Sequence, residues 1–212
     1  MENKDYWSTV VEGNKLYQMG PQSHRTYALK LLAKKGVRSL LDVGCGTAPI
    51  YEILMNAPLQ KYLPISEYKG VDPSADMIEV CKSYFPEGNF EQQNAILLRE
   101  EAASWDALLY MHSFDYIYFY KTAIEEMYRV AKNYVCLIFW QSLNPMYHAD
   151  HKLNNSINGI EEVDWDTARL QYFAWPKLKD ELKEVGFKVI FYEDGEIINK
   201  EGHHNTLILL EK

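Results

Sequence analysis

The feature that decides the fold is the glycine turn Leu41-Asp42-Val43-Gly44-Cys45-Gly46-Thr47-Ala48. It follows residues 37–43, whose continuous apolar run is typical of a strand buried on both faces of a sheet. Apolar side chains at helical spacing come next, at Ile50, Ile53 and Leu54. Glycine permits backbone angles that other residues avoid, and it lets a ligand approach the main chain closely. Because open α/β sheets bind ligands at the carboxyl ends of their strands, the turn predicts a binding site.

Outward from this turn, strand and helix patterns alternate along most of the chain. Strands are expected at 37–43, 68–72, 90–93, 105–111, 135–140, 187–192 and 205–210. Helices are expected at 22–35, after the glycine turn, at 75–85, at 122–132, and from Pro176 to Gly186. This alternation predicts a doubly wound α/β fold, a mostly parallel sheet with helices on both faces. The last two strands have no helix between them, so we expect them to pair antiparallel.

Composition narrows the class of protein. The 212 residues are 47% hydrophobic and 25% charged, which is typical of a globular domain. The formal charge of −8 argues against a nucleic-acid partner, because phosphate binding requires a basic face. We expect a single domain over residues 1–212, with residues 1–21 as an N-terminal lid and 141–175 as an insertion that covers the substrate.

The chain also carries signals about its compartment. Its polar, acidic start predicts no signal peptide, and apolar runs such as 134–140 are too short to cross a membrane. Cys45, Cys81 and Cys136 have no paired spacing and are expected to be small buried residues rather than disulfides or zinc ligands. We therefore expect a cytoplasmic protein without membrane association.

Two ligand classes compete for the glycine turn. A dinucleotide fingerprint requires a third glycine three residues after the second, and Pro49 stands at that position. The alternative ligand is S-adenosylmethionine (SAM), which has an amino-acid end, a sulfonium and an adenosine but no phosphates. The residues that flank the turn favour SAM.

Several motifs in the same order resemble one family. Asp42-Val-Gly-Cys-Gly-Thr resembles the first motif of the class I SAM-dependent methyltransferases, with Ala48 at the place of its third glycine. Residues 68–78 are similar to the second motif, and 105–112 and 123–140 resemble the fourth strand, the next helix and the fifth strand. The likeness covers about 22–140 and 176–212. It implies a Rossmann-like, seven-stranded sheet with an antiparallel C-terminal strand, and SAM as cofactor with S-adenosylhomocysteine as product.

These motifs and their surroundings predict the cofactor site. The residues expected to contact SAM are Arg25, Asp42, Gly44, Cys45, Gly46, Asp72, Pro73, Met77, Asn94 and Ala95. Asp72 would accept hydrogen bonds from the ribose diol, Asn94 would hold the adenine amine, and Arg25 would pair with the carboxylate of SAM. A plainer interpretation stays open for each: Asp42 caps the turn, Asp72 and Asn94 are turn residues, and Arg25 is solvated.

Histidines provide the candidates for catalysis. His112 follows the fourth strand and is a candidate general base, because imidazole titrates near neutral pH. A packing role for His112 is the alternative. His148, Asp150 and His151 are close in sequence, but they fall in an expected loop, so no metal site is predicted.

The expected activity is methyl transfer from SAM to a small-molecule acceptor. The segments that should cover the carboxyl edge of the sheet are residues 1–20, 113–120 and 141–175, and all are rich in aromatic residues. An apolar pocket with few polar groups is typical of small-molecule sites. Two alternatives remain: a methyltransferase that acts on protein or RNA, and a SAM- or nucleoside-binding module without catalysis. The sequence indicates neither the acceptor atom nor the oligomeric state.

Overall fold

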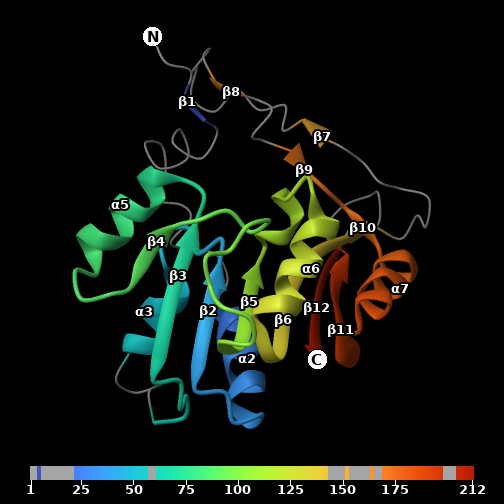
Figure 1. Cartoon of the computed structure of the whole chain (residues 1–212), viewed down its shortest axis with the longest axis horizontal. Helices are drawn as coiled ribbons and strands as arrows, with labels where there is room; N and C mark the ends of the chain where they lie inside the picture. The colour runs from blue at the N-terminus through green and yellow to red at the C-terminus, as the bar shows by residue number, and fades with distance from the viewer. Residues whose placement is uncertain are drawn as a thin grey trace.

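The computed structural model describes residues 4–5, 22–56, 61–142, 151–152, 163–164, 169–197 and 204–212. One mixed sheet runs through this part of the chain, and helices lie on both of its faces (Figure 1). The strand order along its main path is β11-β12-β6-β5-β2-β3-β4, and the short β10 pairs with β6 as an eighth strand. The expected doubly wound, mostly parallel α/β fold is confirmed, with one short strand more than predicted.

The elements follow the expected alternation. The strands of the sheet are β2 (Ser39–Val43), β3 (Glu67–Asp72), β4 (Phe90–Gln92), β5 (Trp105–Met111), β6 (Ala131–Ser142), β10 (Phe173–Ala174), β11 (Lys188–Ile197) and β12 (His204–Glu211). The helices are α2 (Gln22–Lys34), α3 (Pro49–Met55), α5 (Ala75–Tyr84), the 3-10 turn η2 (Phe114–Tyr116), α6 (Tyr120–Val130) and α7 (Trp175–Val185). Two short strand pairs lie outside the sheet, β1 (Lys4–Asp5) with β8 (Val163–Asp164) and β7 (His151–Lys152) with β9 (Arg169–Leu170).

The direction of the last strand agrees with the prediction. β12 runs antiparallel to both of its neighbours, β6 and β11, whereas the other described pairs of this sheet are parallel. Only residues 198–203 connect β11 to β12, and a parallel pairing would need a long crossover.

The predicted end of β11 is wrong. The strand was expected to stop at Tyr192, but it continues to Ile197 because Asp194 and Ile197 still pair with residues of β12. Gly195, which lies beyond the expected end, is inside the strand, where the register shifts between Asp194 and Ile197. A glycine within a strand often marks such an irregularity.

The predicted border between α6 and β6 is also wrong. The helix ends at Val130 and the strand begins at once at Ala131, four residues before the expected position 135. Ala131 pairs with Trp105 of β5, so tertiary pairing extends the strand into a stretch whose local pattern is helical.

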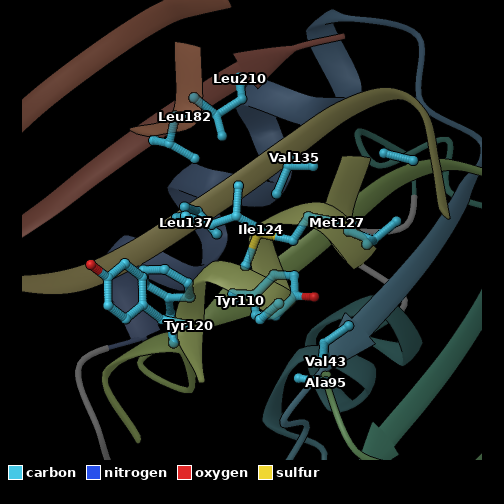
Figure 2. Packing of buried hydrophobic residues seen from close by; sticks show 14 of the residues in the cluster. Val43, Ala95, Tyr110, Tyr120, Ile124, Met127, Val135, Leu137, Leu182 and Leu210 are labelled. Atoms are coloured by element: carbon cyan, nitrogen blue, oxygen red, sulfur yellow. The ribbon is translucent and has the colours of Figure 1, made fainter. Parts of the chain in front are cut away.

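Apolar side chains fill both faces of the sheet. On one face, α6 and α7 pack on it (Figure 2) through a cluster that includes Ile124, Met127, Val135, Leu137 and Leu182. On the other face, α2 and α3 contribute to a second cluster with Leu29, Leu32, Ile50, Cys136 and Ile138. Successive residues of β6 therefore alternate between two buried layers, which explains why its apolar run is continuous.

Some expectations fall outside the described residues. The lid segment 1–21 is described only at β1, and the insertion 141–175 only at its ends and in short strands. The single domain over 1–212 therefore stays a prediction. Cys45, Cys81 and Cys136 are described, and they are free and buried as expected.

The core predicts a contrast between two truncations. Leu137→Ala removes a fully buried side chain from β6 and should lower the free energy of unfolding by roughly 2–5 kcal/mol. Met55→Ala truncates an exposed side chain on α3 and should cost less than about 1 kcal/mol. Urea unfolding followed by circular dichroism measures both, and equal losses would contradict the two-layer core.

Candidate cofactor and acceptor site

A cavity of about 460 Å³ lies at the carboxyl edge of the sheet. β2 sits between β3 on one side and β5 on the other, and the strand order reverses at this point. Open α/β sheets bind ligands at such a switch point. The cavity is lined by most of the predicted site residues, namely Gly44, Gly46, Asp72, Pro73, Met77, Asn94, Ala95 and His112. Asp42, Cys45 and Arg25 are not among its lining residues.

The two glycines of the turn are needed for different reasons. Gly44 has φ +74, and a Cβ there would lie 2.2 Å from the Cβ of Ser113. The hydroxyl of Ser113 donates to the carbonyl of Val43 at 2.5 Å, so Ser113 is held in that place. Gly46 has φ +54, and nothing lies within 4 Å of its Cβ position. Gly44 therefore allows close packing of the chain, whereas Gly46 leaves space on the cavity side.

Asp72 ties the second strand to the glycine turn. Its Oδ2 accepts a hydrogen bond from the amide of Gly46 at 3.0 Å, and its Oδ1 accepts one from the amide of Ser74 at 2.9 Å. A carboxylate can accept about four hydrogen bonds, so both oxygens can also accept from ligand hydroxyls. Asp72 is both a structural residue of the turn and a lining residue of the cavity.

Asp42 lies beneath the turn rather than in the cavity. Its Oδ2 accepts a hydrogen bond from the hydroxyl of Tyr68 at 2.8 Å. Burial raises the pKa of Asp42 to about 7, against the opposing effects of Tyr68 and Arg25. Arg25, on α2, is itself buried. The two residues thus bring opposite charges together below the glycine turn.

Cys45 packs away from the cavity. It belongs to a small buried cluster with Ala48, Ile78 and Cys81. The thiol of Cys81 donates to the carbonyl of Gly46 at 3.0 Å. The side chain of Cys45 therefore supports the turn from the α5 side.

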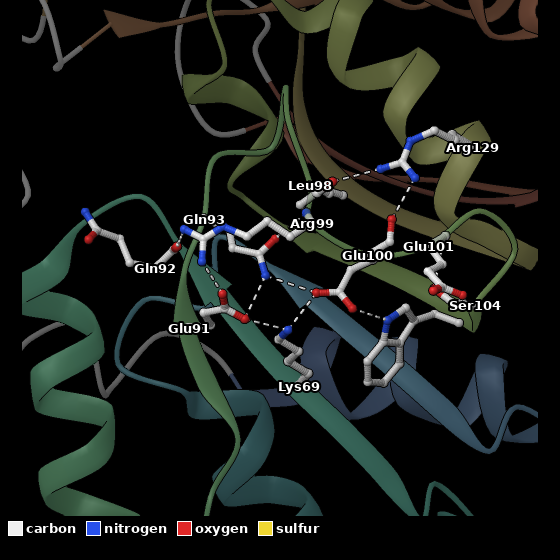
Figure 3. Close-up of polar contacts among 11 residues, drawn as sticks. Lys69, Glu91, Gln92, Gln93, Leu98, Arg99, Glu100, Glu101, Ser104 and Arg129 are labelled. Carbon is white, nitrogen blue, oxygen red and sulfur yellow. Dashed lines mark hydrogen bonds and ion pairs between the residues drawn. The ribbon is translucent and has the colours of Figure 1, made fainter.

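A network of charged side chains supports the loop after β4 (Figure 3). Lys69 Nζ lies 2.7 Å from a carboxylate oxygen of Glu91 and 2.7 Å from one of Glu100. The amide nitrogen of Gln93 donates to the same two carboxylates at 3.1 and 3.0 Å. Burial alone would raise the pKa of Glu100, but hydrogen bonds from Lys69 and other neighbours hold it below its usual range. The network fixes Gln93, a lining residue of the cavity.

Asn94 follows in the same loop and closes a local turn. Its Oδ1 accepts a hydrogen bond from the amide of Ile96 at 3.2 Å, and its carbonyl accepts one from the amide of Leu97 at 3.0 Å. The exposed Asn94 also lines the cavity. The structure therefore combines the turn role with a position from which Asn94 can reach a ligand.

His112 stands at the opposite side of the cavity. It has φ +57, and its amide donates to the carbonyl of Ile138 at 2.9 Å. A left-handed backbone at a residue other than glycine is uncommon and recurs at functional sites. The imidazole lines the cavity, and its centroid lies 5.5 Å from the ring centroids of both His24 and Trp140.

The sequence did not predict several of the lining residues. Gln93, Ser74, Met111 and Ser113 fell within the predicted strands, motifs and covering segments, but none was named as a site residue. Residues 116–119 give the cavity a wall with apolar and aromatic side chains, and Tyr118 and Phe119 are exposed there. The signal that could have identified these lining residues is their position at the ends of strands or in an aromatic segment.

The histidines and aspartate that are close in sequence at 148–151 fall largely outside the described residues. His148, Asp150 and His203 lie outside the described residues, and nothing is described of the side chain of His151. Within the described part of the chain, no group of three or more His, Cys, Asp or Glu residues is placed to hold a metal ion. In that same part, no helix is long and apolar enough to span a membrane.

Comparison with known proteins agrees with this geometry. A family model described as a methyltransferase domain matches residues 41–139, from the glycine turn to the end of the fifth strand. Residues 41–139 are thus similar to a methyltransferase domain, in line with the motifs at the glycine turn.

The curated relatives match only part of the domain. A protein named ubiquinone/menaquinone biosynthesis C-methyltransferase UbiE, from Campylobacter jejuni, is 31% identical over 102 residues. The match covers 48% of this chain and 43% of the relative. The chain thus spans less than half the length of the curated relatives that it matches.

Solved structures share the fold at low sequence identity. A SAM-dependent methyltransferase from Clostridium acetobutylicum has a TM-score of 0.65 at 11% identity, over 93% of this chain and 94% of that one. Magnesium protoporphyrin IX methyltransferase from Synechocystis, with bound S-adenosylhomocysteine, has a TM-score of 0.62 at 14% identity, over 90% of this chain and 83% of that one. A putative methyltransferase from Haloferax volcanii, in complex with the Trm112 activator, has a TM-score of 0.62 at 14% sequence identity over 98% of both chains.

The position of Asp72 predicts its effect on cofactor binding. Asp72→Ala should weaken SAM binding by roughly 1–3 kcal/mol, because ribose hydroxyls and the Gly46 amide lose their acceptor. Glu79→Ala, at an exposed position on α5, is the control and should leave the dissociation constant unchanged. Calorimetric titration measures both variants, and a folded Asp72→Ala protein with wild-type affinity would remove the ribose assignment.

The glycine turn predicts a contrast between two alanine substitutions. Gly44→Ala and Gly36→Ala both impose a left-handed backbone on alanine. Only the new Cβ at position 44 would clash with the side chain of Ser113. Gly36→Ala should cost roughly 1–2 kcal/mol of stability from backbone strain. Gly44→Ala should cost about 1–3 kcal/mol more and lower SAM affinity, because the turn must move. Thermal unfolding and titration with SAM test this, and equal losses of stability would refute the close approach.

Proposed function

We propose that this protein is an enzyme that transfers a methyl group from SAM to a small-molecule acceptor and releases S-adenosylhomocysteine. The observation that carries the proposal is the continuity of one cavity. The cavity runs from Gly46 and Asp72, at the glycine turn, to His112 and an apolar wall at residues 116–119. A cofactor held at the turn and an acceptor held at the wall would meet in the same cavity.

We assign the cofactor contacts by the position of each group. Gly44 and Gly46 lie against the amino-acid part of SAM, Asp72 accepts from the ribose diol, and Asn94 and Ala95 border the adenine. Gly46 fits this role because the space beside its backbone is open. Arg25 is proposed to act on the carboxylate of SAM from behind the turn, near Asp42.

The wall of the cavity supports an apolar acceptor. Met111 and Ile117 line it, and the rings of Tyr118 and Phe119 are 55% and 61% exposed beside it. Apolar linings with few polar groups are typical of small-molecule sites. The net charge of −8 speaks against RNA as the acceptor. The UbiE relative is named as a C-methyltransferase of ubiquinone and menaquinone biosynthesis. A quinone precursor has an aromatic ring, so this name supports an aromatic acceptor.

The protein has a modest chemical task in such a reaction. The sulfonium of SAM supplies an activated methyl group. The chain must align the acceptor with that methyl group and exclude water. His112 is proposed to take a proton from the acceptor, since its ring lines the cavity on the acceptor side.

Calorimetric titration with SAM, S-adenosylhomocysteine and NAD tests the cofactor assignment first. We expect micromolar binding of the two adenosyl compounds and none of NAD, because Pro49 replaces the third glycine of a dinucleotide site. SAM with a labelled methyl group is then offered with phenols, catechols, hydroquinones, aliphatic amines and thiols. Transfer to an aromatic acceptor supports the proposal.

Three results would contradict it. Adenosyl binding with label transfer only to protein or RNA from a lysate would favour a macromolecular substrate. Adenosyl binding without any transfer would favour a binding module, and no adenosyl binding would overturn the enzyme assignment itself.

A further inference from the structure

We propose that Asp115 is a positioning residue that holds the His112 imidazole with its proton on Nδ1, which leaves Nε2 free to accept a proton from the acceptor. The acceptor is then one that carries a proton on its nucleophilic atom, such as a phenol, another hydroxyl or an acidic carbon. This inference rests on the proposed function, but its first test needs neither SAM nor an acceptor.

The carboxyl group of Asp115 is buried with one oxygen unused. Asp115 is 0% exposed, and its Oδ1 accepts a hydrogen bond from the amide of Trp140 at 2.7 Å. Its Oδ2 has no hydrogen-bond partner among the described residues. A buried carboxylate oxygen without a partner is unfavourable, so it points to a group that it meets during function.

The group that faces this oxygen is His112. Its Nδ1 lies 3.8 Å from Oδ2 of Asp115, and Nδ1 is likewise buried without a partner within the part of the chain that the structure describes. The separation exceeds a hydrogen bond, but a small tilt of the ring closes it. Catalytic hydrogen bonds are often long in the absence of ligands and shorten when the complex forms.

The backbone on both sides of the pair is held in place. The amide of Gln171 donates to the carbonyl of Asp115 at 2.7 Å, and the side-chain nitrogen of Gln171 donates to the carbonyl of Ile117 at 2.5 Å. His112 is tied to β6 through the carbonyl of Ile138. A movement that brings the pair together is therefore confined to the side chains.

The ring has one edge toward Asp115 and another toward the cavity. The side chain of His112 is 22% exposed and lines the cavity, while Nδ1 is buried. The exposed part of the ring is therefore the edge that carries Nε2. A neutral imidazole carries a proton on only one of its two nitrogens. If Nδ1–H donates to Asp115, Nε2 keeps its lone pair and is the nitrogen that can act as a base.

The other groups near the ring do not compete for the carboxylate. Within the described residues, the titratable and charged groups packed around it are Asp115 on η2, and His24 with Arg25 on α2. Burial, and then His112 and Arg25, lower the pKa of His24 to about 4, so His24 is neutral at neutral pH. Burial raises the pKa of Asp115, and the neighbouring His112 imidazole and the hydrogen bond from the Trp140 amide oppose that rise.

The chemistry of the pair sets the class of acceptor. The acceptor gives its proton to Nε2 of His112 as its lone pair forms the bond to the methyl carbon. The electron pair of the broken sulfur–carbon bond stays on sulfur, and the imidazolium later releases the proton to water. A thioether or a tertiary amine needs no base, so the pair would serve no purpose for such an acceptor.

The protonation of His112 can be measured directly by nitrogen NMR of protein labelled with ¹⁵N-histidine. His112→Gln identifies the signals. We expect the wild-type ring to be protonated on Nδ1, and Asp115→Asn to shift the proton to Nε2, because an amide donates to Nδ1 instead of accepting from it. Asp180→Asn, an exposed aspartate on α7, is the matched control and should change nothing.

Either of two spectra would overturn the assignment. One is a wild-type His112 protonated mainly on Nε2, and the other is the same tautomer in wild type and Asp115→Asn. The wild-type spectrum decides the question even if Asp115→Asn does not fold. A negative cofactor titration would refute the proposed function without altering this result.

Kinetics with the acceptor found by screening provides the second test. Asp115→Asn should lower kcat by about a hundredfold or more, whereas KM and the dissociation constant of SAM stay within about threefold. The loss should shrink as the acidity of substituted phenols increases, because a phenolate needs no base. A loss that is equal for all phenols, or one that follows KM and SAM affinity, would show a structural role instead.

Discussion

The site depends on the hydrogen bonds by which the end of β3 holds the glycine turn. The carbonyl of Val71 accepts from the amides of Gly44 and Cys45 at 2.7 and 3.0 Å, and Asp72 accepts from Gly46 at 3.0 Å. The turn bends too sharply to satisfy these amides itself, and buried amides without partners are costly. The second strand supplies the partners. The cavity floor is thus formed by two neighbouring strands together.

Each wall of the cavity is held by long-range contacts of a different kind. On the side of β4, the Lys69–Glu100 network fixes Gln93. On the side of β5, Gln171 and Trp140 fix Asp115 beneath His112. Charged side chains stand behind one wall, and a buried carboxyl group and aromatic rings stand behind the other. This division matches a polar cofactor at one end and an apolar acceptor at the other.

Much of the fold followed from local patterns. Two-sided burial gives continuous apolar runs in strands, and the missing helix before β12 required an antiparallel pairing. The boundaries of β6 and β11 did not follow, since Ala131 and Ile197 join strands only because partners lie beside them. The pairing of β10 with β6 likewise has no signal in two residues of sequence.

The sequence by itself determined which residues end β2, β3 and β5, and hence that Gly44, Asp72 and His112 meet at one edge of the sheet. Parallel strands present their carboxyl ends together, so order along the chain is enough. Only the tertiary structure decided that Asp42 lies beneath the turn and that Asp115 faces His112. Burial and side-chain direction come from packing between segments far apart in sequence, and no local pattern encodes them.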